Sequence, residues 1–392
     1  MSGTTLSVVL AERPTGNIIP GQTFKQKLLP SQKEDDLKAG QILVKTLYLG
    51  LEPAMRAWIM DVDTFYPSVK IGEVMRGFVL AQVTASKNSQ VQVGDTILSD
   101  QVGWREEAIL TEEQFEKAPE LGPGFEITDL LGVYHWTGLT AYFGLNKIGH
   151  PKPGETVVIS GAAGATGSIA GQIAKIAGAR VVGIVGSDEK CSWIKELGFD
   201  VALNYKDPDF KSQFEEATPD LIDVFFDNGK YSPITVTYRK IVLTLILSRR
   251  RDPRSGPLES PALFSFCHVG GNQSIQLGIT HWPQELANLS RLQGFIVIDY
   301  ADEFDDARRQ IAQWVAEGKI RTRATVIDGG LKVAEQALQG LFSGTNTVYV
   351  LWLCSMDVSC ALPSSMDTMN RVRWFTMPES RDSGRALEDY DF

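Results

Sequence analysis

The sequence predicts an α/β protein in which a doubly wound parallel sheet is joined to a smaller, mostly β domain. Three observations lead to this fold class. From residue 156 onward, short apolar runs alternate with segments of helical period. A glycine-rich turn at residues 161–167 separates the first apolar run from the first helical segment. Before about Pro123, the apolar runs are instead separated by Gly, Pro and Asn, which is typical of a compact β domain.

Length and composition indicate a folded protein of two domains. The chain has 392 residues, whereas a single core stops growing at about 250–300 residues. Its hydrophobic share of 43% and charged share of 22% are ordinary globular usage. The four cysteines include no C-x-x-C pair and the four histidines include no H-E-x-x-H motif. We therefore expect neither a disulfide framework nor a metal site.

Charge and hydropathy disfavour two classes of partner. The net charge of −10 opposes binding to a nucleic-acid backbone, and the basic run at residues 249–254 is interpreted as a solvated segment. The longest apolar stretches, residues 241–247 and 348–353, are far shorter than the roughly 18–20 residues that cross a bilayer. Residues 1–10 lack the features of a secretory signal. We expect a cytoplasmic protein with neither nucleic acid nor membrane as its partner.

The apolar patterns divide the chain near residue 125. In the first part we expect strands at residues 42–49, 78–83, 94–98 and 107–110. Helical spacing follows at residues 128–145. Beyond it, the βαβ rhythm predicts strands at residues 156–160, 180–185, 201–204, 221–226 and 295–298. The helices of that rhythm are expected at residues 168–177, 190–197, 210–216 and 302–318.

The turn after the first parallel strand has the residues of a dinucleotide-binding loop. It reads Gly161-Ala-Ala-Gly-Ala-Thr-Gly167. Glycines allow a sharp turn and let backbone N–H groups approach a pyrophosphate at the positive N-terminus of the next helix. The spacing G-x-x-G-x-x-G departs from the commoner G-x-G-x-x-G, and an ordinary glycine-rich turn is the alternative. The strand before it and the helix after it favour cofactor binding.

The end of the second parallel strand favours NADP over NAD. An NAD site usually offers an acid to the ribose 2′-hydroxyl, whereas an NADP site offers small residues and a cation to the 2′-phosphate. Here Gly186 and Ser187 follow the strand, and Lys190 lies one turn into the next helix. Asp188 and Glu189 argue the other way, unless they face solvent in the first helical turn, where acids suit the helix dipole.

Several motifs together resemble one family. In order, they are Leu139-Thr-Ala-Tyr-Phe-Gly-Leu145, Gly161-Ala-Ala-Gly-Ala-Thr-Gly167, Gly186-Ser-Asp-Glu-Lys190, Leu197-Gly-Phe-Asp200, Asn204-Tyr-Lys206, Gln293-Gly-Phe-Ile-Val297 and Gly344-Thr-Asn-Thr347. The chain resembles the prostaglandin reductase and leukotriene B4 12-hydroxydehydrogenase family, which includes alkenal double-bond reductases. The resemblance extends over residues 43–228 and 293–347.

The resemblance implies a GroES-like domain of residues 1–125, completed by residues 313–347, and a Rossmann domain of residues 126–312 that binds NADPH. The candidate cofactor residues are Gly161, Ala163, Gly164, Ala165, Thr166, Gly167, Ser187, Lys190, Tyr205, Asn228, Phe295, Ile296, Val297 and Asn346. Lys190 and Tyr205 would lie at the 2′-phosphate, and the last five residues at the nicotinamide half. The alternative is that Tyr205 and Phe295 are core aromatics and that Asn228 and Asn346 are turn residues.

The resemblance also implies a metal-free reductase. Zinc-bearing relatives carry G-H-E near a segment that here reads Gly72-Glu-Val-Met-Arg-Gly77. Hydride transfer to the β-carbon of an enal, enone or quinone needs only the cofactor and donors near the carbonyl oxygen. Candidate donors are Tyr48 and Tyr66, beside Glu52-Pro-Ala-Met-Arg56. Many family members have Tyr where this chain has Ala54, so the donor and the shape of the substrate stay open.

Two segments depart from the family pattern. Residues 229–268 are predicted to be an irregular insert and residues 348–392 an irregular tail. Gly229-Lys-Tyr can be encoded by GGTAAGTAT, which contains the GTAAGT of a splice donor. We interpret both segments as retained intron sequence, with a genuine lineage-specific insertion as the alternative. Sequencing the transcript across both junctions decides between them.

The sequence therefore predicts an NADPH-dependent 2-alkenal or enone reductase. A quinone reductase is the alternative within enzymes, and a cofactor-binding but catalytically silent protein is the alternative outside them. Relatives are commonly dimers, so a homodimer is also expected.

Overall fold

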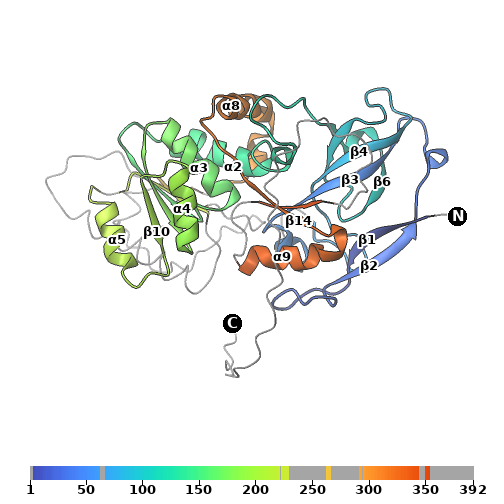
Figure 1. The fold of residues 1–392 in the computed structure, drawn as a ribbon, viewed down its shortest axis with the longest axis horizontal. Helices are drawn as coiled ribbons and strands as arrows, with labels where there is room; N and C mark the ends of the chain where they lie inside the picture. The colour runs from blue at the N-terminus through green and yellow to red at the C-terminus, as the bar shows by residue number, and fades with distance from the viewer. Residues whose placement is uncertain are drawn as a thin grey trace, which may run out of the picture. The chain divides into compact units, whose positions relative to one another are not determined.

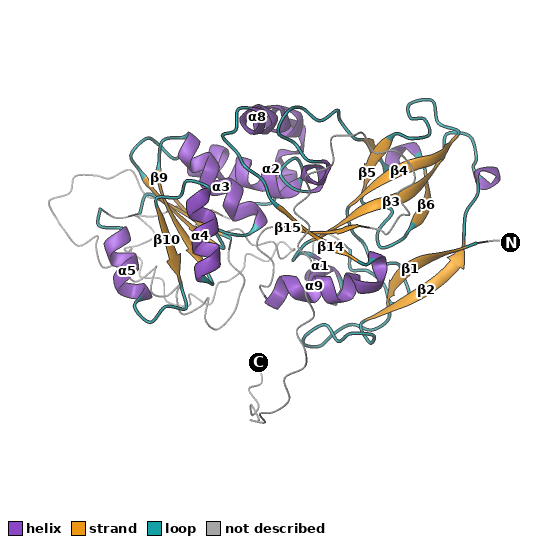
Figure 2. Cartoon of the chain, viewed as in Figure 1, coloured by secondary structure: helices purple, strands orange, loops and turns teal. Residues whose placement is uncertain are grey.

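The computed structural model describes residues 3–61, 67–220, 222–228, 262–265, 291–293, 295–343 and 349–353. These residues belong to one compact unit, residues 1–356. Their strands form a parallel sheet, a mixed sheet and a two-stranded hairpin (Figures 1 and 2). This is the predicted fold class, a doubly wound parallel sheet joined to a GroES-like, mostly β domain.

The parallel sheet has the strand order β10-β9-β8-β11-β12-β13. Counted along the chain from β8, that order is 3-2-1-4-5-6, the doubly wound arrangement whose ligands bind at the carboxyl ends of the strands. The strands are β8 (Thr156–Ser160), β9 (Arg180–Val185), β10 (Val201–Asn204), β11 (Val224–Asp227), β12 (Ala262–Ser265) and β13 (Arg291–Gln293). The helices are α2 (Trp136–Phe143), α3 (Ala165–Ile176), α4 (Asp188–Glu196), α5 (Phe210–Ala217) and α8 (Phe304–Ala316), with the short helices η4 (Gly144–Gly149) and η6 (Val297–Glu303).

Alternate residues of the central strand enter two separate cores. Val157 and Ile159 of β8 pack with the apolar face of α3, whereas Val158 packs with Phe214 and Leu203 on the other face of the sheet. A strand that is covered on both faces needs apolar side chains at successive positions. This explains why β8 reads as a short continuous apolar run.

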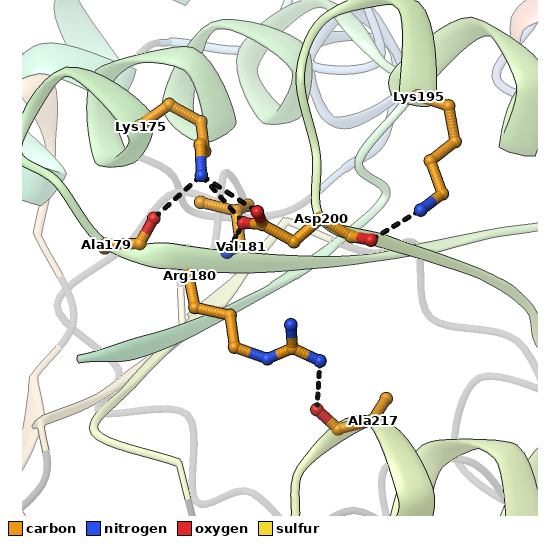
Figure 3. A network of polar contacts seen from close by, with 7 residues as sticks. All are labelled: Lys175, Ala179, Arg180, Val181, Lys195, Asp200 and Ala217. Atoms are coloured by element: carbon orange, nitrogen blue, oxygen red, sulfur yellow. Dashed lines mark hydrogen bonds and ion pairs between the residues drawn. The ribbon is translucent and has the colours of Figure 1, made fainter. Parts of the chain in front are cut away.

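One polar network fixes the amino ends of β9 and β10 to the helices beside them (Figure 3). Lys175 Nζ of α3 lies 2.9 Å from Asp200 Oδ2, which also accepts a hydrogen bond of 2.6 Å from the Val181 N–H. Lys195 donates to the Asp200 carbonyl, and Arg180 donates to the Ala217 carbonyl. Burial alone would raise the pKa of Asp200, but the hydrogen bonds from Lys175 and Val181 outweigh it, so the pKa is lowered.

The mixed sheet combines strands from residues 42–117 with strands from residues 324–353. Its order is β14-β15-β3-β4-β5-β7, with β6 paired to β3. Its strands are β3 (Ile42–Leu51), β4 (Val79–Ser86), β5 (Thr96–Ser99), β6 (Glu107–Leu110), β7 (Glu116–Lys117), β14 (Ala324–Asp328) and β15 (Tyr349–Leu353), and β1 (Thr4–Leu10) with β2 (Phe24–Pro30) forms the hairpin. The remaining helices are η1 (Glu34–Asp36), α1 (Met55–Trp58), η2 (Glu112–Gln114), η3 (Ile127–Leu131), η7 (Gly330–Val333) and α9 (Ala334–Ser343). Leu331 and Leu338 share a core with Val44 and Trp104, so η7 and α9 pack against the mixed sheet.

Three expected boundaries are wrong. The helix expected at residues 128–145 is interrupted between η3 and α2, because Gly132 leaves helical dihedral angles, and α2 then continues directly into the π-helical turn η4. Residues 295–298 form no strand: β13 already holds that place in the sheet, and η6 begins at Val297. The returning segment was expected from residue 313, but α8 continues past it, and Val315 and Ile320 pack in the parallel-sheet core.

The insert and the tail are not irregular throughout. Within residues 229–268, β12 pairs in parallel with β11 and with β13. Within residues 348–392, β15 pairs in parallel with β14 and antiparallel to β3. Both corrections involve short apolar runs that stand outside the strand–helix alternation by which the other short strands were identified. The rest of both segments lies outside the described residues, and the splicing interpretation stays a prediction.

No helix in the described part of the chain is long and apolar enough to span a bilayer.

Candidate functional site

The turn between β8 and α3 requires glycine at two positions for steric reasons. Gly161 has φ +56°, and a Cβ there would lie 2.8 Å from the Asn228 carbonyl oxygen. A Cβ on Gly167 would lie 2.4 Å from the Gly161 carbonyl oxygen. Side chains at these positions would separate the turn, α3 and the end of β11. The expected glycine loop is therefore a close packing of three backbone segments.

The helix that follows the turn can accept an anion. Gly164 is the N-cap residue of α3, and its N–H bonds the Gly161 carbonyl at 2.9 Å. Ala165 begins the helix, and Ala163 and Thr166 are buried on either side of it. The first N–H groups of a helix have no partner within the helix, and the helix dipole favours negative charge there. The turn thus fits a pyrophosphate held by backbone groups.

A buried hydrogen-bonded pair fixes the carboxyl ends of β8 and β11. Ser160 Oγ donates to Asp227 Oδ1 at 2.5 Å, and the Asn228 N–H donates to Ser160 Oγ at 2.8 Å. Ser160 is fully buried and Asp227 nearly so. Sequence analysis did not select this pair, although a polar residue that ends each of two parallel strands is the signal for it. The pair holds Asn228 beside Gly161.

The carboxyl end of β9 gathers the residues expected at the 2′-phosphate. Ser187 caps α4, and its Oγ accepts a 3.3 Å hydrogen bond from the Lys190 N–H. The Tyr205 ring lies against Gly186, where a Cβ would be 3.1 Å from Tyr205 Oη. Burial lowers the pKa of the half-buried Lys190, and the charge of Lys206 lowers it further. The structure thus brings Ser187, Lys190 and Tyr205 together.

The two acids that argued for NAD are directed elsewhere. Asp188 and Glu189 are both exposed in the first turn of α4. Asp188 Oδ1 accepts a 2.9 Å hydrogen bond from Asn204 Nδ2. Their place in the first turn suits the dipole of α4, as the alternative reading of these acids required.

The residues expected at the nicotinamide half are divided. Phe295 and Val297 are buried in the parallel-sheet core, and the Phe295 ring centroid lies 6.2 Å from that of Tyr300. Their side chains therefore pack in the core, as the alternative interpretation held for Phe295. Ile296 is half-buried, and Asn228 is half-buried at the end of β11. Asn346 lies outside the described residues.

The candidate donors in the first domain are less accessible than expected. Tyr48 is 5% exposed in an apolar cluster with Leu80, Leu98 and Leu130. Tyr66 lies outside the described residues. The motif beside them holds other polar groups: Glu52 Oε1 and Arg56 Nη1 are buried and have no hydrogen-bond partner in the part of the chain that the structure describes. Burial raises the pKa of Glu52 to about 7 and lowers the pKa of Arg56.

Among the described residues, we find no group of three or more His, Cys, Asp or Glu side chains that could hold a metal ion. The segment Gly72-Glu-Val-Met-Arg-Gly77 leads directly into β4 through Phe78, whose ring centroid lies 4.7 Å from that of His135. Burial lowers the pKa of His135 to about 3, and the charge of Arg308 adds to this effect. His135 is therefore a neutral packing group at ordinary pH.

Comparison with known proteins identifies the family. The profile described as the N-terminal domain of oxidoreductase matches residues 7–118, and the one described as zinc-binding dehydrogenase matches residues 165–236. The NADPH-dependent curcumin reductase of Escherichia coli (strain K12) is 36% identical over 347 residues, which are 86% of this chain and 93% of that protein. Prostaglandin reductase 1 of Bos taurus is 38% identical over 321 residues, 79% of this chain and 88% of that protein.

A solved structure agrees with these relatives. CurA of Vibrio vulnificus, in complex with NADPH, superposes with a TM-score of 0.73 at 30% identity, covering 90% of this chain and 99% of that one. The chain belongs to the zinc-free medium-chain dehydrogenases/reductases of the prostaglandin reductase type.

Ser160→Ala should destabilise the parallel-sheet domain. The change leaves the buried Asp227 carboxyl without one donor and the Asn228 N–H without its acceptor, which costs about 1–3 kcal/mol. Chemical denaturation measures the free energy of unfolding. Ser192→Ala is the control, because that exposed hydroxyl bonds only to the Asp188 carbonyl of its own helix. Equal stability of the two variants would contradict the role of Ser160.

Glu52→Gln should change how stability depends on pH. Because the pKa of Glu52 rises from 4.5 to about 7 on folding, the folded chain holds the proton more tightly than the unfolded chain. This contribution is therefore complete below pH 4.5 and is lost as the pH rises through about 7. Glu52→Gln removes the loss, so its stability relative to the natural chain should be greater at pH 8 than at pH 5, by on the order of 1–3 kcal/mol. Glu120→Gln, at an exposed carboxyl, is the control, and an equal response of both variants would refute the burial of the Glu52 charge.

Proposed function

We propose that this protein uses NADPH to reduce carbon–carbon double bonds conjugated to a carbonyl, as in 2-alkenals and enones. The observation that carries the proposal is the site at the end of β9, where Gly186, Ser187, Lys190 and Tyr205 gather beside the glycine turn. The names of the relatives support it, since one is an NADPH-dependent curcumin reductase and the other a prostaglandin reductase.

Each part of the cofactor has candidate residues in this chain. Backbone groups of residues 161–167 would hold the pyrophosphate, because the turn is closed by glycines and opens onto the start of α3. Ser187, Lys190 and Tyr205 would hold the 2′-phosphate. Asn228, with the backbone of Phe295, Ile296 and Val297 and with Asn346, would lie at the nicotinamide half. NADPH, when bound, supplies the hydride.

The first domain would position the substrate. Reduction adds a hydride to the β-carbon and a proton to the α-carbon, and negative charge develops on the carbonyl oxygen between these events. Arg56 donates through Nη2 to the Gly16 carbonyl, but its buried Nη1 has no acceptor among the described residues, and Glu52 is a buried carboxyl that holds a proton near neutral pH. Buried polar groups normally have partners, so these two are suited to a polar ligand. We add them to Tyr48 and Tyr66 as candidate donors.

NADPH should bind more tightly than NADH, and Lys190→Ala should remove much of the difference. A charge-assisted hydrogen bond to a phosphate contributes about 1.5–3 kcal/mol, so the loss should be tenfold or more in NADPH affinity. Calorimetric titration with both cofactors measures it, with NADH as the internal control for folding. An equal loss of affinity for both cofactors, or no loss for NADPH, would show that Lys190 does not bind the 2′-phosphate.

A panel of acceptors tests the reaction. The natural chain should oxidise NADPH in the presence of 2-alkenals and enones but not of the saturated aldehydes, and a metal chelator should leave the rate unchanged. Product analysis should show a saturated carbonyl compound. Turnover of quinones alone would instead assign a quinone reductase. Tight NADPH binding with no turnover on any acceptor would assign a catalytically silent protein.

A further inference from the structure

Two lysines from different elements lie near enough to each other at the carboxyl end of the parallel sheet for their charges to interact. Lys190 is in the first turn of α4, and Lys206 follows β10. Lys206 Nζ lies 5.9 Å from the centroid of the Tyr205 ring. The same ring packs against Gly186, close to the cap residue of α4. The charge of Lys206 contributes to the lowered pKa of Lys190, so the two ammonium groups interact.

The turn that carries Lys206 is fixed by hydrogen bonds. Asn204 Oδ1 accepts from the Lys206 N–H at 3.1 Å, while Asn204 Nδ2 donates to Asp188 Oδ1 at 2.9 Å. The Tyr205 N–H bonds the Val185 carbonyl at 3.0 Å. Asn204 thus links the turn after β10 to Asp188 at the start of α4.

Two like charges held near each other repel, and a ligand with two negative charges relieves that repulsion. A phosphate monoester carries about −1.5 to −2 charges at pH 7. A ribose hydroxyl carries none and gains nothing from a second cation. The pair of lysines therefore distinguishes a phosphorylated ribose from an unmodified one more strongly than one lysine can.

We propose that Lys206 is a second cation for the 2′-phosphate of NADPH and that Asn204 is the positioning residue that holds it there. This inference rests on the proposed use of NADPH. Cofactor selectivity would then depend on two elements, α4 and the turn after β10. The sequence motif had indicated only Lys190 and Tyr205.

Binding measurements on the full chain test the proposal. Lys206→Ala should weaken NADPH and 2′,5′-ADP by about fivefold, the range of a partly exposed charge pair, and leave NADH unchanged. Asn204→Ala should also lower the affinity for NADPH. Asn204→Asp should restore the acceptor for the Lys206 N–H but lose the donor to Asp188. Lys211→Ala, an exposed lysine of α5, is the control for net charge. The dependence of NADPH affinity on salt should become less steep in Lys206→Ala and stay unchanged in Lys211→Ala.

The outcomes separate this inference from the proposed function. If the natural chain prefers NADPH and Lys206→Ala keeps that preference and the salt dependence, Lys206 has no part in phosphate binding and the inference is overturned. If the natural chain does not distinguish NADPH from NADH, both the proposed cofactor and the inference fail. A fall in NADPH affinity that Lys211→Ala reproduces would assign the effect to net charge and would also overturn it.

Discussion

The close contact between Gly161 and the end of β11 is the constraint on which the candidate cofactor site depends. Because a Cβ at residue 161 would lie 2.8 Å from the Asn228 carbonyl oxygen, the turn, the start of α3 and the tip of β11 can meet only through glycine. The Ser160–Asp227 hydrogen bond joins the ends of the same two strands, β8 and β11, through their side chains. The direction of α3, and hence of its dipole, follows from this contact between β8 and β11.

Polar side chains have different roles at the amino ends and at the carboxyl ends of the parallel strands. At the amino ends of β9 and β10, Lys175 bonds to Asp200, Asp200 accepts from the Val181 N–H, and Arg180 donates to the Ala217 carbonyl, so their charges are used for structure. At the carboxyl ends, the Tyr205 ring packs against Gly186, Lys206 lies over that ring, and the charge of Lys206 acts on Lys190. Parallel strands bring all of their carboxyl ends to one edge, which is where such sheets bind ligands.

Sequence analysis predicted β8, β9 and β10 of the parallel sheet well, because each of these strands coincides with an apolar run bounded by glycine or helix signals. The glycine turn and the residues after β9 were also predictable, since each depends on local chain geometry. The Ser160–Asp227 pair was missed because its members are 67 positions apart and meet only through strand pairing. Likewise, nothing in the motif Glu52-Pro-Ala-Met-Arg56 shows that two of its polar atoms are buried with no partner among the described residues. The strand β12 was missed because Ala262–Ser265 follows a Pro- and Arg-rich stretch in which the strand–helix alternation is lost.

The pairing of β3 with β15 has a consequence for the order of folding during synthesis. Leu51 pairs with Val350, so one ladder of the mixed sheet joins residues about 300 positions apart. A ribosome that adds about 5–20 residues per second exposes β3 for some 15–60 seconds before β15 emerges. In that interval the parallel-sheet domain has all of its strands, whereas the N-terminal domain still has an open sheet edge at β3. The second domain along the chain can therefore complete its sheet before the first, and the nascent N-terminal domain is the part most exposed to aggregation through an unpaired strand edge.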